Sequence, residues 1–284
     1  MNDLFLVCLG GSGSKVMEAV THMAAMDAWS ARNIHALLVD VDGGNGNQDR
    51  AQKTVEYYSA IHHLRSPSIY DVVDSELFRT EITLYPWYPT TNGANLATYK
   101  KPSENSASAI VSRFLFTESE RSMNIDEGFK GHPNLGVLFM QKILDAQDPV
   151  AGSALGDFLD AAMREKAERT NNGEEMRIFV VGSCFGGTGA SCIPVLGRYL
   201  RKQLGDDLQM GLLAMLPTFS LRKSESASSI DPDSAVFDNR VKTVLSTYID
   251  QDVLVYFSQE SNLSLQIYDH IYLLGSPELI PYPI

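Results

Sequence analysis

One stretch of the chain, residues 176–204, restricts the fold more than any other. An apolar, β-branched run ends at Val181 and is followed by the small residues of Gly182–Ser191, after which a helix-like segment begins at Cys192. A strand, a glycine-rich loop and a helix in this order direct backbone N–H groups and a helix N-terminus toward an anion, usually phosphate. Glycine suits such a loop because it accepts positive φ and allows a ligand to approach the main chain closely.

Strand-like and helix-like segments alternate along much of the chain. Continuous apolar runs predict buried strands of a parallel sheet, and apolar residues at helical spacing predict helices. The expected strands are Leu4–Leu9, Ile34–Val41, Met176–Val181, Gln209–Pro217, Asp252–Phe257 and His270–Leu274, and the expected helices are Lys15–Met26, Ser153–Glu168, Cys192–Leu204 and Ala235–Ile249. This alternation predicts an α/β fold with a doubly wound, mostly parallel sheet and helices on both faces.

The middle of the chain interrupts the alternation. We interpret residues 46–127 as an irregular insertion, with candidate helices at Gln52–Leu64 and Ser108–Phe116. With this insertion, residues 1–284 are expected to form a single nucleotide-binding domain. Because the chain stops in mid-pattern at Ile284, we expect it to be the N-terminal part of a longer protein.

Composition limits the class of partner. The 284 residues are 44% hydrophobic and 20% charged, as in an ordinary globular protein. The net charge of −12 disfavours nucleic acid, whose binding relies on Lys and Arg, but allows a small nucleotide bound by backbone dipoles and Mg²⁺. Cys8, Cys184 and Cys192 include no CxxC pair, which argues against a disulfide framework or a zinc site and favours the cytoplasm. The N-terminus lacks the basic region of a signal peptide, and no apolar run reaches the roughly 18 residues that span a bilayer.

Three further loops accompany the glycine-rich motif. Gly10–Ser14 follows the first strand, but it lacks the Gly-Lys-Ser/Thr triplet of a P-loop, and Val16 stands where a dinucleotide fingerprint has its third glycine. Asp40 and Asp42 follow the second strand, and Gly128–Pro133 is a turn that precedes a helix. Since ligands of open parallel sheets bind at the carboxyl ends of the strands, we expect these loops to share a nucleotide with several phosphates.

Each of these features also has a plain structural interpretation. Gly10–Ser14 alone is equally typical of a tight turn between a strand and a helix. Asp40 and Asp42 either hold Mg²⁺ through water or contact the nucleotide, or they only cap the following turn. His132 either touches a phosphate or packs within its loop.

A different class of function also fits the central motif. Gly182–Gly186 matches the G-x-C-x-G pattern of a nucleophile elbow between a strand and a helix, with Cys184 as the nucleophile. Asp250 or Asp252, followed by His270, would complete a triad in α/β-hydrolase order. A thiolate at a helix N-terminus would be activated by the helix dipole. This interpretation predicts a cysteine hydrolase, but it gives the other glycine loops no role.

The motifs and their order resemble those of the tubulin/FtsZ superfamily. Phe185–Ser191 is similar to the signature GGGTG(T/S)G, and Gly128–Gly136 to the GxGxxPxxG loop that closes over the γ-phosphate. Leu6–Gly13 looks like the first phosphate loop, and Ala36–Asp42 like the second strand and its acidic loop. The resemblance covers residues 4–45 and 128–257, and it fits the uncharacterised bacterial tubulin-like proteins better than FtsZ itself.

The resemblance implies a protein that binds GTP or GDP with Mg²⁺ and that self-assembles or switches with its nucleotide. Its nucleotide-binding residues would be Gly10, Gly11, Ser12, Gly13, Asp40, Asp42, Gly128, Gly131, His132, Pro133, Gly186, Gly187, Thr188, Gly189, Phe237 and Asn239. Phe237 falls near the aromatic residue that lies beside the guanine base in this superfamily.

The chain departs from the superfamily pattern at three places. Ser183–Phe185 stands where the signature prefers glycines, and Arg198 stands near the position of a ribose-binding glutamate. After Phe257, the long central helix and a catalytic loop with two acidic residues are expected, but another strand-like run, Ile271–Leu274, follows instead. In this superfamily the acidic loop of one subunit completes the site of the next. Catalytic residues therefore stay unassigned, and a non-hydrolysing switch or assembly module is the alternative to a GTPase.

Overall fold

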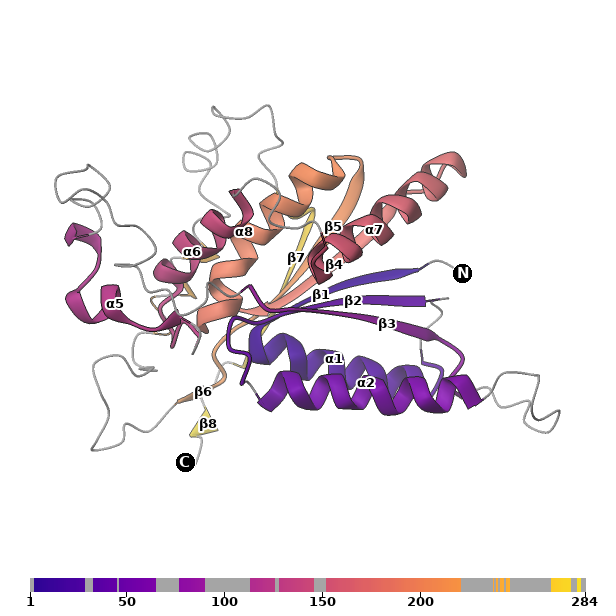
Figure 1. The fold of residues 1–284 in the computed structure, drawn as a ribbon, viewed down its shortest axis with the longest axis horizontal. Coiled ribbons are helices and arrows are strands. Elements are labelled where there is room, and N and C mark those ends of the chain that lie inside the picture. The colour runs from indigo at the N-terminus through magenta and orange to yellow at the C-terminus, as the bar shows by residue number, and fades with distance from the viewer. Residues whose placement is uncertain are drawn as a thin grey trace.

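Six parallel strands form the central sheet of the protein (Figure 1). The computed structural model describes residues 3–28, 33–44, 46–64, 77–89, 113–125, 128–145, 152–220, 237, 239, 241–242, 244–245, 267–276 and 280–281. The strands, in their order across the sheet, are β3 (Glu81–Trp87), β2 (Asn33–Val39), β1 (Leu4–Leu9), β4 (Met176–Ser183), β5 (Leu208–Met215) and β7 (His270–Leu274). A separate pair joins β6 (Phe219–Ser220) to β8 (Ile280–Pro281).

Helices cover both faces of the sheet. On one face lie α1 (Gly10–Ala25) and α2 (Gly46–Leu64), and on the other lie α6 (Pro133–Asp145), α7 (Ala154–Asn171) and α8 (Gly187–Leu204) (Figure 1). The short helix α5 (Glu118–Ser122) precedes α6. The prediction of a doubly wound, mostly parallel α/β fold is confirmed. Among the described residues, none of the helices combines the length and the apolar character that crossing a membrane requires.

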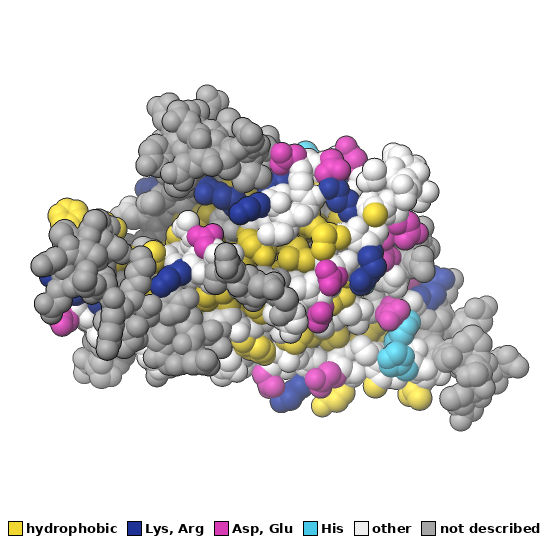
Figure 2. Space-filling view, turned by 45° about the horizontal axis from the view of Figure 1, so that its top comes forward, with side chains coloured by type: hydrophobic (Ala, Val, Ile, Leu, Met, Phe, Trp, Pro, Cys, Tyr) yellow, Lys and Arg dark blue, Asp and Glu magenta, His cyan; other side chains and the backbone are white. Residues whose placement is uncertain are grey.

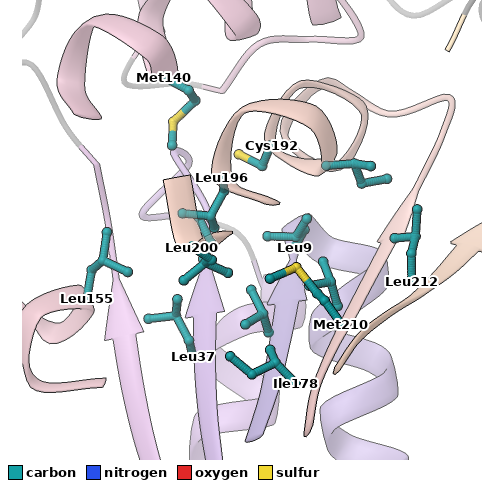
Figure 3. Packing of buried hydrophobic residues seen from close by; sticks show 14 of the residues in the cluster. Leu9, Leu37, Met140, Leu155, Ile178, Cys192, Leu196, Leu200, Met210 and Leu212 are labelled. Carbon is teal, nitrogen blue, oxygen red and sulfur yellow. The ribbon is translucent and has the colours of Figure 1, made fainter. Parts of the chain in front are cut away.

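The central strands β1, β2 and β4 are largely apolar because both of their faces are buried, whereas the side chains of the edge strand β7 are exposed. In β1, Leu6 and Cys8 pack toward α1 and α2, whereas Phe5, Val7 and Leu9 pack toward the other helical layer. Figure 3 shows the second set of contacts, in which strand residues meet α6, α7 and α8. The labelled side chains are Leu9, Leu37, Met140, Leu155, Ile178, Cys192, Leu196, Leu200, Met210 and Leu212. A buried parallel strand reads as a continuous apolar run for this reason.

The segment 46–127 contains one helix that was predicted and one strand that was not. The candidate helix Gln52–Leu64 is confirmed as the longer helix α2, whereas β3 was not predicted. Its described part includes α2, which packs on α1 with an ion pair of 2.9 Å between Arg50 and Glu18, and β3, which pairs with β2 over its whole length. The interpretation of this segment as irregular is wrong for these two elements. The strand was obscured by Pro86, which a strand tolerates at the edge of a sheet, where its missing N–H is not needed. The assignment of residues 1–284 to one domain stays a prediction.

The helices that follow the two glycine motifs begin earlier than predicted. α1 begins at Gly10 instead of Lys15, and α8 begins at Gly187 instead of Cys192. The glycines of both motifs therefore form the first turns of helices, and each helix follows its strand almost directly. The first turn of a helix has backbone N–H groups without partners in the helix. These backbone N–H donors therefore lie at the carboxyl edge of the sheet.

The described C-terminal part matches the prediction except for the short strand β8, which was not predicted. Residues 237, 239, 241–242 and 244–245 are helical, within the expected helix Ala235–Ile249, and β7 has the expected bounds. The expected strand Asp252–Phe257 lies outside the described residues. β7 pairs in parallel with β5, from Gly211↔His270 to Met215↔Leu274.

Charged side chains of both signs are mixed on the face of the protein that Figure 2 shows. Basic side chains stand among acidic ones, and apolar side chains gather between them in the middle of this face. The whole sequence carries 23 basic and 35 acidic residues.

Candidate functional site

The first, second and signature loops meet at the carboxyl ends of β1, β2 and β4. Gly10 has φ of 67° and lies against the first turn of α8, since a Cβ placed on it would be 3.4 Å from the backbone nitrogen of Gly189. The Thr188 hydroxyl donates a hydrogen bond of 3.0 Å to Oδ1 of Asp40. These two contacts bring together three segments that are far apart in the sequence.

The turn at residues 128–133 joins the same cluster. A Cβ placed on Gly187 would lie 2.9 Å from the Cβ of Phe129 and 3.2 Å from the backbone nitrogen of Gly131. A Cβ on Gly128 would lie 3.4 Å from the Cβ of Asp42. All four loops expected to share a ligand are therefore neighbours at one edge of the sheet.

Two of the predicted glycines have a packing role. A Cβ on Gly13 would lie 2.6 Å from the carbonyl carbon of Cys8, and one on Gly189 would lie 2.7 Å from the carbonyl oxygen of Ser183. Real Cβ atoms do not approach other atoms so closely. These glycines allow α1 and α8 to start directly against the strands that precede them. The first turns of both helices, with Gly11 and Ser12 in that of α1, are fixed in place at the sheet edge.

The N-termini of α1 and α8 are open to an acceptor. Their N-cap residues, Leu9 and Gly186, make no side-chain capping hydrogen bond, and neither first turn contains an acidic residue. α7, in contrast, is capped by the Ser153 hydroxyl, which accepts from the Gly156 nitrogen at 3.2 Å. Unpaired N–H groups and the positive end of the helix dipole favour an anion at such a terminus.

The two aspartates lie in the cluster and also cap their own loop. Asp40 is 2% exposed and accepts from Thr188 and from the Asp42 nitrogen at 3.3 Å. Asp42 in turn accepts from the Gly44 nitrogen at 2.9 Å. Within the described ranges, no group of three or more His, Cys, Asp and Glu side chains could hold a metal ion. The pair suits Mg²⁺, which commonly takes one or two carboxylates and completes its shell with phosphates and water.

The turn at residues 128–133 is held in an unusual backbone conformation. Gly128, Lys130 and Gly131 all have positive φ, and the His132 nitrogen donates to the Phe129 carbonyl at 2.7 Å. Pro133 is the first residue of α6, where its fixed φ suits the helix. The His132 side chain contacts Glu120, with Nδ1 3.0 Å from Oε1.

An aromatic pair lies beside the signature. The ring of Phe237 is buried, and its centroid lies 5.2 Å from that of Phe185, which immediately precedes Gly186. Asn239 is exposed in the same helical segment. Phe185 was not among the predicted binding residues, although an aromatic residue inside a glycine-rich signature is itself a signal. Phe237 is thus placed next to the signature.

The structure argues against the cysteine hydrolase. Cys184 is 1% exposed, and burial raises the pKa of its thiol to about 11. In the register of the sheet, His270 of β7 pairs with Gly211 of β5, and Gly211 pairs with Phe179 of β4. Five residues at about 3.3 Å each separate Phe179 from Cys184, or about 16 Å along the sheet. His270 therefore cannot reach the thiol, and Asp250 and Asp252 lie outside the described residues.

Comparisons with known proteins found matches among solved structures and among family models. Two matching solved structures are a GTPγS-form protofilament of TubZ from Bacillus thuringiensis serovar israelensis and a helical model of the two-stranded TubZ-Bt filament. They are 11% and 10% identical to the chain, with a TM-score of 0.41 each. The matches cover 96% and 97% of this chain but only 48% and 46% of the TubZ chains, so this chain spans about half their length.

None of the curated proteins matches the chain. The model of one protein family, described as "Tubulin like", matches residues 5–233. This match includes the first loop, the two aspartates, the turn at 128–133 and the whole glycine signature. The chain therefore belongs to the tubulin-like family.

Proposed function

We propose that this protein binds a guanine nucleotide with Mg²⁺ at the carboxyl edge of its parallel sheet. The observation that carries the proposal is the meeting of four loops, in which Gly10 contacts Thr188 and Gly189 while Gly187 contacts the turn at 128–133. Two uncapped helix N-termini point their donors at this edge. A nucleotide with several phosphates offers the negative charge that such an arrangement favours.

Each loop has a distinct role in this proposal. The first turns of α1, at Gly10–Gly13, and of α8, at Gly186–Gly189, would donate backbone N–H groups to the phosphates. Asp40 and Asp42 would hold Mg²⁺, whose charge offsets that of the phosphates at a site with few basic residues. The turn with Gly128, Gly131, His132 and Pro133 would face the γ-phosphate.

The aromatic pair indicates the place of the base. Phe237 packs against Phe185 next to the signature, and Asn239 follows on the same helical segment. A guanine base would lie beside Phe237, and the Asn239 amide would offer both a donor and an acceptor to its edge.

Family membership leads us to propose nucleotide-dependent self-association or switching in the cytoplasm, with GTP hydrolysis as a further step. Hydrolysis would need acidic residues supplied by a neighbouring subunit. A switch that binds but does not hydrolyse GTP is the alternative.

The test begins with the purified protein. We expect denaturation to release GTP or GDP, identified by chromatography, at up to one nucleotide per chain. Release of an adenine nucleotide instead would contradict the proposal. Phosphate release, measured over a range of protein concentrations, then separates the two alternatives. A shared site gives a rate per subunit that rises with concentration, whereas a non-hydrolysing switch releases no phosphate at any concentration.

A further inference from the structure

We propose that Glu120 positions His132 toward the nucleotide, so that the short helix α5 becomes part of the triphosphate-sensing side of the site. This inference rests on the proposed function, because it assigns a partner to a residue of the turn that would face the γ-phosphate. The two residues are 12 positions apart in the sequence, and the fold brings their side chains together.

The contact between Glu120 and His132 is largely buried from solvent. The Glu120 and His132 side chains are 16% and 15% exposed, and Oε1 of Glu120 lies 3.0 Å from Nδ1 of His132. A charged or hydrogen-bonded contact with little water around it holds its partners in a defined orientation more strongly than an exposed one.

The carboxylate of Glu120 is itself fixed. Its other oxygen, Oε2, accepts hydrogen bonds of 2.8 Å from the backbone nitrogen and from the hydroxyl of Thr117, which caps α5. The Glu120 nitrogen bonds back to the Thr117 hydroxyl and completes a capping box. Burial opposes ionisation of Glu120, but the hydrogen bonds from Thr117 and His132 outweigh it, and its pKa is lowered. Glu120 is therefore an acceptor.

The contact with Glu120 determines which ring nitrogen of His132 is protonated. An ionised carboxylate can only accept hydrogen bonds, so Nδ1 of His132 must carry the hydrogen and donate it to Glu120. The opposite nitrogen, Nε2, remains for a contact on the other side of the ring. The partner of a histidine sets which ring nitrogen is protonated, and thus what the other nitrogen can do.

The main chain of His132 is also bound within the turn and to the start of α6. The His132 nitrogen and carbonyl are both bound, to Phe129 and Gly136 respectively, and Phe129 touches Gly187 in the signature. A displacement of His132 would therefore also displace residues that contact the first turn of α8. In the same way, a γ-phosphate that moved the turn would move His132 relative to Glu120 in α5.

The test compares nucleotide affinities by calorimetry with GTPγS and GDP. Glu120→Gln retains the capping box, because glutamine also serves at this position. Its amide oxygen then faces Thr117 and its NH₂ group faces His132, which reverses the hydrogen bond. We expect Glu120→Gln and Glu120→Ala to weaken GTPγS binding at least 5-fold while GDP binding changes less than 2-fold. The matched control is Glu118→Gln, which removes the same charge from the same helix at a side chain that is 94% exposed.

The outcomes separate the two claims. A merely structural role of Glu120 would weaken GTPγS and GDP equally, and an unchanged ratio in both Glu120 variants, with their folds intact by circular dichroism, would overturn this inference alone. In the double variant Glu120→Gln with His132→Ala, the loss should not exceed that of His132→Ala, because both act through one ring. An additive loss would also overturn the inference. Failure of the unaltered chain to bind either nucleotide would overturn the proposed function itself.

Discussion

The contact between Gly187 and the turn at residues 128–133 provides a direct test of the site. In Gly187→Ala, the new Cβ would lie 2.9 Å from the Cβ of Phe129, whereas ordinary contacts begin at 3.4 Å. The turn must therefore retreat from α8 by at least about 0.5 Å, and overpacking of this kind costs roughly 1–3 kcal/mol of folding free energy. If one hydrogen bond to a phosphate is also lost, the free energy of nucleotide binding weakens by about 1.5–3 kcal/mol, which lowers the affinity roughly 10- to 150-fold.

Calorimetric titration with GTPγS measures this effect, and thermal unfolding shows whether the variant is folded. The matched control is Gly46→Ala, in the first turn of α2, where a new Cβ would meet no atom within 4 Å. We expect the control to bind as the unaltered protein does. A folded Gly187→Ala protein with unchanged affinity would refute the role of this contact in nucleotide binding.

Three other predictions concern stability and reactivity. Thr188→Val keeps the shape of the side chain but removes the donor to the buried Asp40, so urea denaturation should show a loss of about 1–3 kcal/mol; no measurable loss would mean that Asp40 finds another donor. Native Cys184 should resist alkylation near neutral pH, because it is buried and its pKa is raised to about 11, whereas the unfolded chain should react quickly; rapid native labelling at Cys184, located by mass spectrometry, would contradict this burial. The pKa of Asp269 is lowered, since hydrogen bonds from the Met210 nitrogen and Arg201 outweigh burial. Its contribution to stability is therefore present above the ordinary pKa of 3.8 and is lost as the pH falls below that value. Asp269→Asn should be less stable than the unaltered protein at neutral pH, with the difference shrinking in acid; a difference that persists at all pH values would show that the charge is not responsible.

The parts of the fold that could be predicted from the sequence are those in which the pattern of apolar residues alone determines the element. β1 and β7 have the predicted bounds, because short apolar runs between polar residues leave few alternatives. β3 was not predicted, because Pro86 is tolerated in a strand mainly at the edge of a sheet, and the position of a strand in the sheet is a property of the whole fold.

The starts of α1 and α8 were missed for a different reason. Glycine has a low helix propensity, so Gly10–Gly13 and Gly187–Gly189 look like loops. Tertiary packing reverses this preference, since Gly13 and Gly189 lie where no side chain fits against Cys8 and Ser183. The contact of Glu120 with His132 was not predicted, because it depends on how helix α5 and the turn at residues 128–133 pack against each other.

The most direct test of the central claim is a calorimetric competition between GTPγS and ATPγS on the chain freed of nucleotide. The account predicts one site per chain, affinity for GTPγS in the micromolar class with Mg²⁺ present, and much weaker binding of ATPγS. Equal affinity for the two nucleotides would contradict a guanine site beside Phe237, and no binding of either by the folded chain would contradict the nucleotide site as a whole.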